Sequence, residues 1–473
     1  MTKIELEFLR SATTIDSSIF PNERVLEWIE ARRSAVTTTV RQIPLEQMRK
    51  WRRDSATGTI RHDSGRFFSI EGIRVKSDWG SVPHWDQPII NQPEIGYLGL
   101  LGKKMNGVLH LLVQAKIEPG NINLVQISPT LQATKSNYSQ VHQGKRPRYL
   151  EYFNGEKPAT LLLDQLQSEQ GARFLRKRNR NIIVEVPTEE EIETHPDFAW
   201  MSIGQIKRMM RHDNIVNMDT RTVLSGINFG GYSPETLEGV FTLAAHGHEN
   251  RLMLASALST GNARNDFRNI ISWITRLKSR YELIVERLPL DQVLGWQEVD
   301  GEIRRADGKY FTVIGVNVAI NNREVASWDQ PMIRPSQEGL IAFIVRPING
   351  IYHFLVQAKL EAGNFDIIEL APTVQCLTGN YRVGLNEYSV NYINEVLSAP
   401  ASSVLYSALQ SEEGGRFFNE QNRNMIVEVS EDFPLEVSDN YCWMTLNQML
   451  RLIEFNNYLN IAARSLISAI TFV

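Results

Sequence analysis

The chain has 473 residues, which is too long for one hydrophobic core and suits two or three domains. Hydrophobic residues make up 42% and charged residues 22%, and the net charge of −4 gives no electrostatic argument for binding to nucleic acid or to a membrane. No stretch approaches the roughly 20 apolar residues that span a bilayer, and the first residues lack the apolar core of a signal peptide, so we expect a cytoplasmic protein.

In chain order, the first half is expected to begin with a helix over residues 21–33, in which Trp28 lies on the apolar face. Short β-branched runs bounded by polar residues predict strands over residues 67–75, 108–117, 123–127 and 182–186. A helix is predicted over residues 160–170. Another is predicted to begin at Ser202, which has capping-box spacing with Gln205.

The second half repeats these signals. A helix is predicted over residues 269–278, strands over 310–318 and 351–360, and a capped helix at Thr445. From about residue 66 onwards the two copies are offset by 243 residues without insertion or deletion. Loops tolerate length changes at little cost, so identical loop lengths indicate loops with a function. The period is too long for a solenoid repeat and indicates a duplicated domain.

The repeat predicts three parts: a first repeat over residues 1–225, a linker over 226–265 and a second repeat over 266–473. The linker begins with a glycine-rich stretch and continues as a predicted helix. Strands mixed with a few helices, without regular βαβ alternation, predict an α+β fold.

The first recurrent polar segment follows a predicted strand. Gln114, Lys116 and Glu118 alternate along it and so project to one face, and Asn121 follows a glycine. The second copy repeats the pattern at Gln357, Lys359 and Glu361. Such a row can line a pocket; the alternative interpretation is a cross-strand salt bridge on a solvated face.

The second segment carries Thr130, Gln132, Asn137 and Tyr138. Its counterparts in the second copy are Thr373, Gln375, Asn380 and Tyr381. Amides and hydroxyls at this density can donate hydrogen bonds to a sugar or a phosphate. The alternative is that Asn and Thr serve only the loop geometry.

The third segment carries Glu169, Arg173, Asn179, Arg180 and Asn181. The second copy keeps Arg416, Arg423 and Asn424 at the matching positions. The planar guanidinium donates two parallel hydrogen bonds, which suits a diphosphate, although an arginine buried against a carboxylate is an equal alternative. The basic run at residues 176–180 has no basic counterpart at 419–423, which argues against nucleic-acid binding.

Several common motifs are missing from the sequence: the dinucleotide-binding and Walker glycine loops, the Gly-x-Ser-x-Gly elbow, and paired His or Cys at metal-ligand spacing. The two cysteines, Cys376 and Cys442, match Ala133 and Ala199 in the first copy. We therefore expect buried small residues in a reducing compartment, with no disulfide and no metal site.

Together these motifs resemble the NDP-hexose 2,3-dehydratase family over nearly the whole chain. The resemblance implies two tandem Nudix-like domains that lack the Nudix metal-binding signature. It also implies action on dTDP-4-keto-6-deoxy-D-glucose, from which water is removed across C2 and C3. The resulting enol becomes a 3,4-diketo sugar for a partner NADPH-dependent 3-ketoreductase. A homodimer without a cofactor is expected.

The chemistry requires a base at C3, an acid at the C2 hydroxyl and a partner for the enolate oxygen. The acid or base candidates are Glu118, Tyr138, His142 and Glu169. Lys116 is a candidate to polarise the ketone, Arg173 and Arg180 to bind the diphosphate, and Trp85 to pack on the base or the sugar, with Trp328 as its counterpart.

His142 faces Leu385 in the second copy, and Lys177 faces Glu420. The first copy is therefore expected to be catalytic, and the second to bind nucleotide without turnover or to be structural. Two further functions stay open: a non-catalytic nucleotide-sugar-binding protein and a nucleotide-sugar hydrolase. The hydrolase is disfavoured because metal-dependent hydrolysis needs clustered carboxylates in the Nudix pattern.

Overall fold

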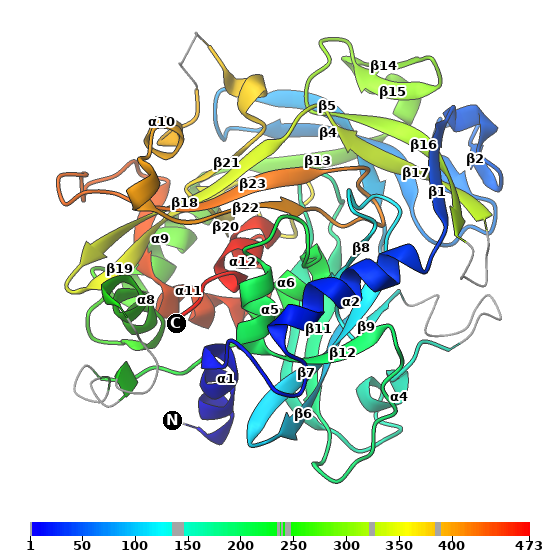
Figure 1. Ribbon diagram of the computed structural model, residues 1–473. Coiled ribbons are helices and arrows are strands. Elements are labelled where there is room, and N and C mark those ends of the chain that lie inside the picture. The colour runs from blue at the N-terminus through cyan, green and yellow to red at the C-terminus, as the bar shows by residue number, and fades with distance from the viewer. Residues whose placement is uncertain are drawn as a thin grey trace.

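The computed structural model describes residues 2–473 apart from 135–145, 234–236, 238–239, 242–246, 321–326 and 384–388. Within these ranges the strands form two seven-stranded and two five-stranded sheets, with helices between and around them (Figure 1). The fold is α+β, as predicted, and consists of two repeated halves.

The elements of the first half are α1 (Lys3–Thr13), α2 (Asn22–Ser34), β1 (Thr38–Ile43), η1 (Leu45–Gln47), β2 (Trp51–Arg53), β3 (Ile60–His62), β4 (Ser69–Ser77), β5 (His84–Asn91), β6 (Tyr97–Met105), β7 (Val108–Ile117), β8 (Val125–Ser128), β9 (Leu131–Ala133), α4 (Leu150–Phe153), β10 (Thr160–Ser168), β11 (Arg178–Glu185), β12 (Phe198–Ser202), α5 (Ile203–Met209) and α6 (Met218–Ser225).

The elements of the second half are α8 (His248–Leu258), α9 (Phe267–Arg280), β13 (Leu283–Leu288), η2 (Leu290–Gln292), β14 (Trp296–Val299), β15 (Glu302–Arg305), β16 (Phe311–Ile320), β17 (Ser327–Pro335), β18 (Gly339–Ile348), β19 (Ile351–Lys359), β20 (Glu369–Ala371), β21 (Val374–Cys376), η3 (Thr378–Tyr381), α10 (Ile393–Leu397), η4 (Ala401–Ser403), β22 (Val404–Ser411), β23 (Gln421–Glu428), β24 (Tyr441–Thr445), α11 (Leu446–Ile453) and α12 (Ile461–Ser468).

Each half has its own seven-stranded mixed sheet. In the first half the order is β10-β11-β6-β7-β12, with β8 paired to β7 and β9 to β6, and the second half repeats this arrangement. The β6–β11 and β18–β23 pairs are parallel, and the other pairs in these sheets are antiparallel. The central helices α6 and α12 are buried along their whole length between the halves (Figure 1).

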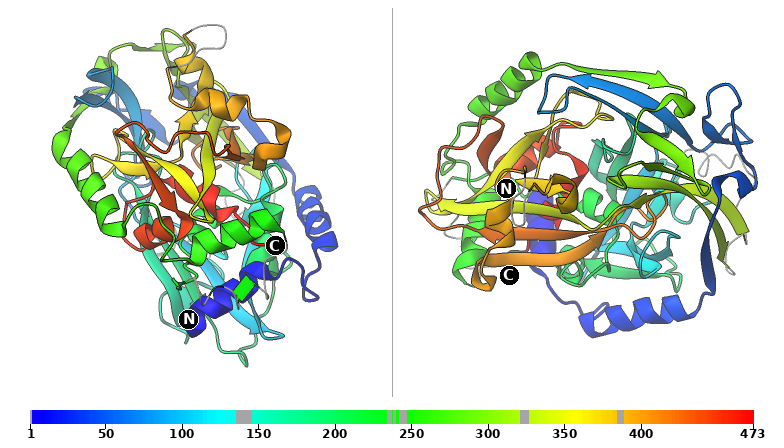
Figure 2. Two further views of the ribbon diagram at one scale, coloured as in Figure 1. Left: turned by 90° about the vertical axis from the view of Figure 1, so that its left-hand side faces the viewer. Right: turned by 90° about the horizontal axis from the view of Figure 1, so that it is seen from above.

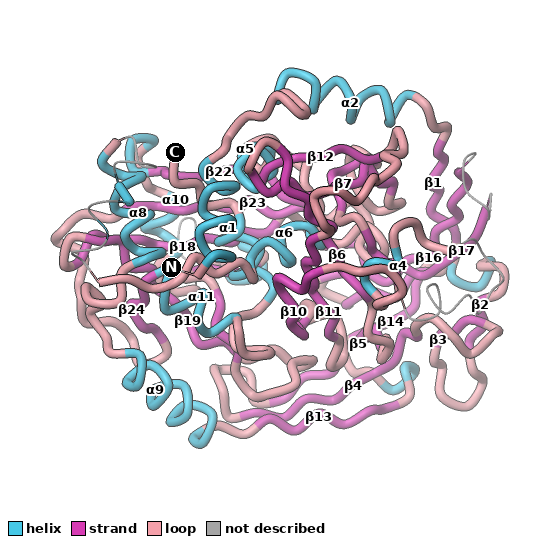
Figure 3. The backbone as a smooth tube through the Cα atoms, turned by 90° about the horizontal axis from the view of Figure 1, so that it is seen from below, coloured by secondary structure: helices cyan, strands magenta, loops and turns pink. Residues whose placement is uncertain are grey.

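The two five-stranded sheets exchange a strand between the halves. Strand β1 of the first half pairs with β16 of the second, and β13 of the second half pairs with β4 of the first, as Figure 3 shows for β13 and β4. Helices α2 and α9, which precede these exchanged strands, lie on opposite outer edges of the molecule (Figures 2 and 3). Each half therefore completes a sheet of the other.

The structure confirms most of the predicted elements. Helices α2 and α9 lie where helices were predicted, and both capping boxes are formed, at Ser202 and at Thr445. The predicted strands are present with shifts of up to four residues at their ends. Cys376 and Cys442 are free thiols and are half-buried, whereas buried side chains were expected.

The helix predicted over residues 160–170 is wrong, because this segment forms strand β10. The sequence of β10 is rich in Leu and Gln, which favour a helix in isolation. In the fold, however, β10 pairs antiparallel with β11, with Leu166 opposite Arg180. Pairing and packing in a sheet override such weak local preferences.

Helices α1 and α8 make equivalent hydrogen bonds in the two halves. The hydroxyl of Ser11 donates to the Leu109 carbonyl (2.6 Å) and accepts from the Ile203 amide (2.9 Å). The hydroxyl of Ser256 likewise donates to Tyr352 (2.5 Å) and accepts from the amide of residue 446 (2.9 Å). We therefore propose that the second repeat begins at α8, within the segment that the sequence assigns to a linker.

Within the described ranges, none of the helices combines the length and the apolar character needed to cross a bilayer.

Candidate functional site

The polar row on β7 ends in a buried carboxylate. Lys116 Nζ lies 3.7 Å from Glu118 Oε1, and Gln132 Nε2 donates to the same oxygen over 2.7 Å. Glu118 is 4% exposed, so this pair does not lie on a solvated face. Glu118 Oε2 and both amide atoms of Asn121 are buried and have no hydrogen-bond partner among the described residues. The first and second polar segments therefore meet at Glu118, and Gln114 lies half-buried at the start of the row.

The second repeat builds the same arrangement. Lys359 Nζ donates to the Gln375 carbonyl (2.7 Å), and Gln375 Nε2 donates to Glu361 Oε1 (3.1 Å). Burial lowers the pKa of Lys359. Glu361 is buried and Gln357 is half-buried, like their counterparts in the first repeat.

Each of these turns packs against the other repeat. The Gly120 amide donates to the Gly414 carbonyl (2.8 Å), and the Gly120 carbonyl accepts from Asn419 (2.8 Å). In the mirrored contact, the Gly363 amide donates to Gly171 (2.6 Å) and the Gly363 carbonyl accepts from the amide of residue 176 (2.7 Å). The Lys-x-Glu turn of one copy therefore meets the Glu-x-Gly-x-Arg segment of the other copy, which makes two composite sites.

Glycine is required at these contacts because the two backbones approach closely. A Cβ atom on Gly120 would lie 1.7 Å from the Phe417 carbonyl oxygen, and one on Gly363 would lie 1.7 Å from that of Phe174. No side-chain rotation can relieve a clash with a backbone oxygen. The recurrence of glycine two residues after each glutamate thus reflects the packing of the halves.

Charged groups from both repeats gather at the first composite site. They are Lys116, Glu118, Glu169, Lys177, Asp219, Glu413 and Arg416. Burial raises the pKa of Glu413; Arg416 opposes this shift, and Glu118 adds to it. Burial also raises the pKa of Asp219, with the charges of Glu413 and Glu118 adding to the shift. The clustering of shifted carboxyl groups is typical of a site that transfers protons.

Asn179 links the carboxylate of Glu169 to this cluster. Its Nδ2 donates to Glu169 Oε1 (2.7 Å), and its Oδ1 accepts from Lys177 Nζ (2.8 Å) and from the Gly96 amide (3.1 Å). Burial raises the pKa of Glu169 to about 7, with the charge of Glu413 adding to the shift. Glu169 can therefore change its protonation state near neutral pH.

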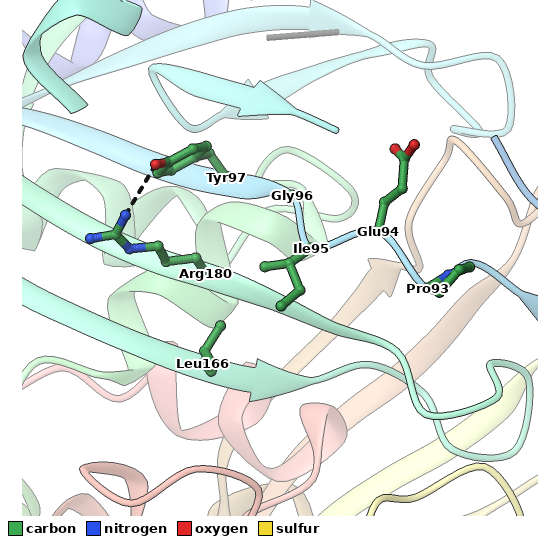
Figure 4. A pocket seen from close by; sticks show the side chains of 7 residues that line it. All are labelled: Pro93, Glu94, Ile95, Gly96, Tyr97, Leu166 and Arg180. Carbon is green, nitrogen blue, oxygen red and sulfur yellow. Dashed lines mark hydrogen bonds between the residues drawn. The ribbon is translucent and has the colours of Figure 1, made fainter. Parts of the chain in front are cut away.

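An open pocket of about 610 Å³ lies beside the cluster (Figure 4). Its lining residues are Pro93, Glu94, Ile95, Gly96, Tyr97, Leu166 and Arg180. Lys177 Nζ donates to the Glu94 carbonyl, so one wall of the pocket is also in contact with the charged cluster.

Arg180 is held against a carboxylate in this pocket. Its Nε and Nη2 donate to the two oxygens of Asp164 (2.6 and 2.7 Å), and its Nη1 donates to the Tyr97 hydroxyl (3.1 Å; Figure 4). A bidentate pair of this kind leaves less of the positive charge for a diphosphate.

The two repeated arginines of the third segment stack on aromatic rings. Arg416 lies 4.1 Å from the Phe68 ring centroid and donates through Nε to Gln92 Oε1 (3.1 Å). Arg173 lies 4.3 Å from the Phe311 ring centroid. Each ring belongs to the other repeat, so both arginines also join the halves.

The Trp-Asp-Gln-Pro motifs contact the composite sites through their glutamines, since Gln330 Nε2 donates to the Gly415 carbonyl (2.7 Å) and Gln87 Nε2 donates to the Ala172 carbonyl (3.0 Å). Asp86 accepts from Arg74 Nη2 (2.9 Å) and from the Leu294 amide of the second repeat (3.1 Å). Trp85 donates to Gln87 within the motif (2.9 Å) and packs in a hydrophobic cluster of its own. Trp328 repeats this bond with Gln330 (2.9 Å). Through the contact of Asp86 with Leu294, the first motif joins the two halves.

Other predicted residues stabilise the sheets. Thr130 accepts from the Leu101 amide (2.9 Å) and donates to a strand carbonyl, and Thr373 does the same at Ile344 (2.9 Å). Asn181 is buried beside helix α6, and Asn424 is buried in strand β23. In the second repeat, the side chains of Asn380 and Arg423 are half-buried and that of Tyr381 is exposed. Asn137, Tyr138 and His142 lie outside the described residues.

The sequence motifs did not point to Glu413, Lys177, Asp219, Arg221 or Arg464 as site residues. The arginines recur at the common offset, which was a usable signal. Arg221 donates to the Ser411 carbonyl and to Ser465 Oγ (2.6 Å), and Arg464 donates to the Ser168 carbonyl. Glu413 is visible in sequence only as a position where the copies differ, since the first copy has Gln170 there.

Among the described residues, no group of three or more His, Cys, Asp or Glu side chains has an arrangement that could hold a metal ion.

Comparison with known proteins shows a close likeness along the whole chain. A family model described as NDP-hexose 2,3-dehydratase matches residues 22–227 and 267–470. Three curated relatives are each described as dTDP-4-dehydro-6-deoxy-alpha-D-glucopyranose 2,3-dehydratase. The protein from Saccharopolyspora spinosa is 44% identical over 98% of this chain and 94% of its own length. Those from Amycolatopsis orientalis and Streptomyces violaceoruber are 40% and 42% identical over 97% and 94% of this chain, and over 92% and 95% of their own lengths.

Proposed function

We propose that this chain, which belongs to the NDP-hexose 2,3-dehydratase family, removes water across C2 and C3 of dTDP-4-keto-6-deoxy-D-glucose. It is a carbon–oxygen lyase of the hydro-lyase class. The observation that carries the proposal is the composite site, where two repeats bring a lysine, an arginine and several carboxyl groups together at the end of β7.

The reaction requires a base because the C4 ketone acidifies the C3 proton. Glu118 suits this role because Gln132 and Lys116 both approach its Oε1, while its Oε2 has no hydrogen-bond partner among the described residues. Removal of the proton leaves an enolate with negative charge on the C4 oxygen. The ammonium group of Lys116, 3.7 Å from Glu118, is suited to stabilise that charge.

The nucleotide is assigned to the open pocket beside the cluster. The Tyr97 ring can stack on a base, and Arg180 lies 5.3 Å from the centre of this ring. Arg416 supplies a second cationic group at the composite site. We propose that the diphosphate lies between the pocket and the Lys116–Glu118 pair.

The remaining features follow from the family resemblance and stay proposals. The product enol becomes a 3,4-diketo sugar for an NADPH-dependent 3-ketoreductase, and each half has a Nudix-like fold. A homodimer and a cytoplasmic location are proposed on the same ground, as is catalysis in the first repeat.

The proposal is tested by incubating the protein with dTDP-4-keto-6-deoxyglucose, a 3-ketoreductase and NADPH. Mass spectrometry should detect a 2,6-dideoxy-4-keto nucleotide sugar that depends on both enzymes. Unchanged substrate would support a binding protein instead. Cleavage of the diphosphate that requires a divalent metal would support a hydrolase.

A further inference from the structure

Glu413 of the second repeat lies next to the polar row of the first repeat. Its neighbour Gly414 accepts the Gly120 amide (2.8 Å), and a Cβ atom on Gly414 would lie 2.8 Å from Glu118 Cβ and 2.3 Å from Asn121 Oδ1. Glu413 is half-buried. The two glutamates come from different repeats and share one environment.

The surroundings of the two carboxyl groups differ. Glu118 accepts a hydrogen bond from Gln132 and lies 3.7 Å from the ammonium group of Lys116, so a hydrogen-bond donor and a cation both face its carboxyl group. The charged groups that act on Glu413 come from its own turn, from β7 and from the segments packed around it: Arg416, Lys116, Glu118, Glu169, Lys177 and Asp219. Burial raises the pKa of Glu413, so its protonated form is favoured over that of an exposed glutamate.

A dehydration across C2 and C3 needs a base and an acid at the same time. Two carboxyl groups in different surroundings can divide these roles. We propose that Glu413, carried by the second repeat, is the catalytic acid that protonates the leaving C2 hydroxyl, opposite Glu118 as the base; this inference rests on the proposed function.

The proposed step is balanced without a redox partner. Glu118 takes the C3 proton, and the C3–H electron pair forms the C3=C4 bond of an enolate. The enolate then re-forms the C4 ketone and a C2=C3 double bond as the C2–O bond breaks. Glu413 gives its proton to the departing oxygen, which leaves as water. The two glutamates exchange protonation states in each turnover, so solvent resets both.

The mirrored composite site keeps the base but lacks the acid. It retains Lys359 and Glu361, yet Gln170 takes the place of Glu413. Glu420 and Ala462 take the places of Lys177 and Asp219. The exchange of Glu413 for Gln170 therefore accounts for the expectation of a single working site. It also shows that Glu413→Gln is a substitution that the fold accepts, because the first copy already carries glutamine at this position.

The test is Glu413→Gln in the full-length protein, with Glu436→Gln as a matched control at a side chain that is 97% exposed. Turnover of Glu413→Gln should fall about 100-fold or more, the usual contribution of a general acid, while KM changes little. Exchange of the C3 hydrogen with D₂O, followed by NMR, should continue in the variant because Glu118 is intact. Glu413→Asp should retain at least about tenfold more turnover than Glu413→Gln, and Glu436→Gln should match the wild type.

Turnover of Glu413→Gln within about threefold of the wild type would overturn the proposal, as would an unchanged pH profile of turnover. Loss of exchange together with elimination, in a variant with wild-type thermal unfolding, would also overturn it, because Glu413 would then act before the C2–O bond breaks. Absence of product from the wild-type protein would instead overturn the proposed function.

Discussion

Replacing Gly120 by alanine tests the close contact between the repeats. The new methyl carbon would lie 1.7 Å from the Phe417 carbonyl oxygen, whereas an ordinary carbon–oxygen contact is about 3.3 Å. One backbone must therefore move by more than 1 Å. That movement strains or breaks the two hydrogen bonds that Gly120 makes with Gly414 and Asn419.

The expected cost has two parts. Each lost hydrogen bond contributes about 0.5–1.5 kcal/mol and overpacking about 1–3 kcal/mol, so the free energy of unfolding should fall by about 2–6 kcal/mol. Displacing Glu118 and Asn121 by about 1 Å should also lower turnover about 100-fold. Urea denaturation and the coupled reductase assay measure the two effects. Gly363→Ala makes the mirrored clash, so it should cost similar stability but less turnover if catalysis belongs to the first repeat.

Gly155→Ala is the matched control. Gly155 has φ +83°, and a Cβ atom there would meet nothing within 4 Å, so only backbone strain of about 1–2 kcal/mol is expected, with normal turnover. The reasoning would be refuted if Gly120→Ala cost no more than Gly155→Ala and kept wild-type turnover. The two halves would then be free to slide at this contact.

The other predictions concern charge and burial. Lys116→Met should lower turnover about 100-fold or more, because it removes the cation that stabilises the enolate. The loss of turnover in Lys359→Met should be smaller by a factor of about ten or more. Equal losses in the two variants would contradict a catalytic first repeat. Burial lowers the pKa of Lys207 from 10.5 to about 7, so between these pH values the unfolded chain binds a proton that the folded chain does not. As the pH drops from 10.5 to 7, Lys207 should therefore lower the free energy of unfolding of the wild type by about 1.4 kcal/mol per pH unit. Lys207→Met should lack this component. The prediction would be contradicted if the free energies of unfolding of wild type and variant, measured in urea, changed in parallel with pH. Arg221→Met should cost about 3–5 kcal/mol in urea denaturation, because it leaves the Ser411 carbonyl and Ser465 without their donor; a cost under 1 kcal/mol would contradict the assigned contacts.

Much of the secondary structure could be predicted because its causes are local. Strand β7 alternates polar and apolar residues at its carboxyl end, and the capping boxes at Ser202 and Thr445 satisfy amides three residues away. The segment of β10 was mispredicted because its leucines and glutamines favour a helix locally, while its pairing with β11 is a longer-range effect.

The site could be predicted only in part. The Lys116–Glu118 row and Gln132, which were predicted from the sequence as parts of two separate segments, come together in the structure. Trp85 and Thr130 recur just as faithfully, yet the structure places them in a hydrophobic cluster between the halves and in a sheet. Recurrence marks positions under a common constraint, and packing imposes that constraint as strictly as chemistry does.

By itself, the sequence determined that the chain is a duplication, where most strands and helices lie, and which family the motifs resemble. Only the tertiary structure decided which copy of each motif meets which. The turn at Gly120 faces Gly414 rather than Gly171, although both carry the same local pattern. The physical reason is the exchange of β1 and β13, which interlocks the halves and brings the end of β7 against the other repeat. No local pattern records that pairing, because it depends on backbone contacts between segments far apart in the chain.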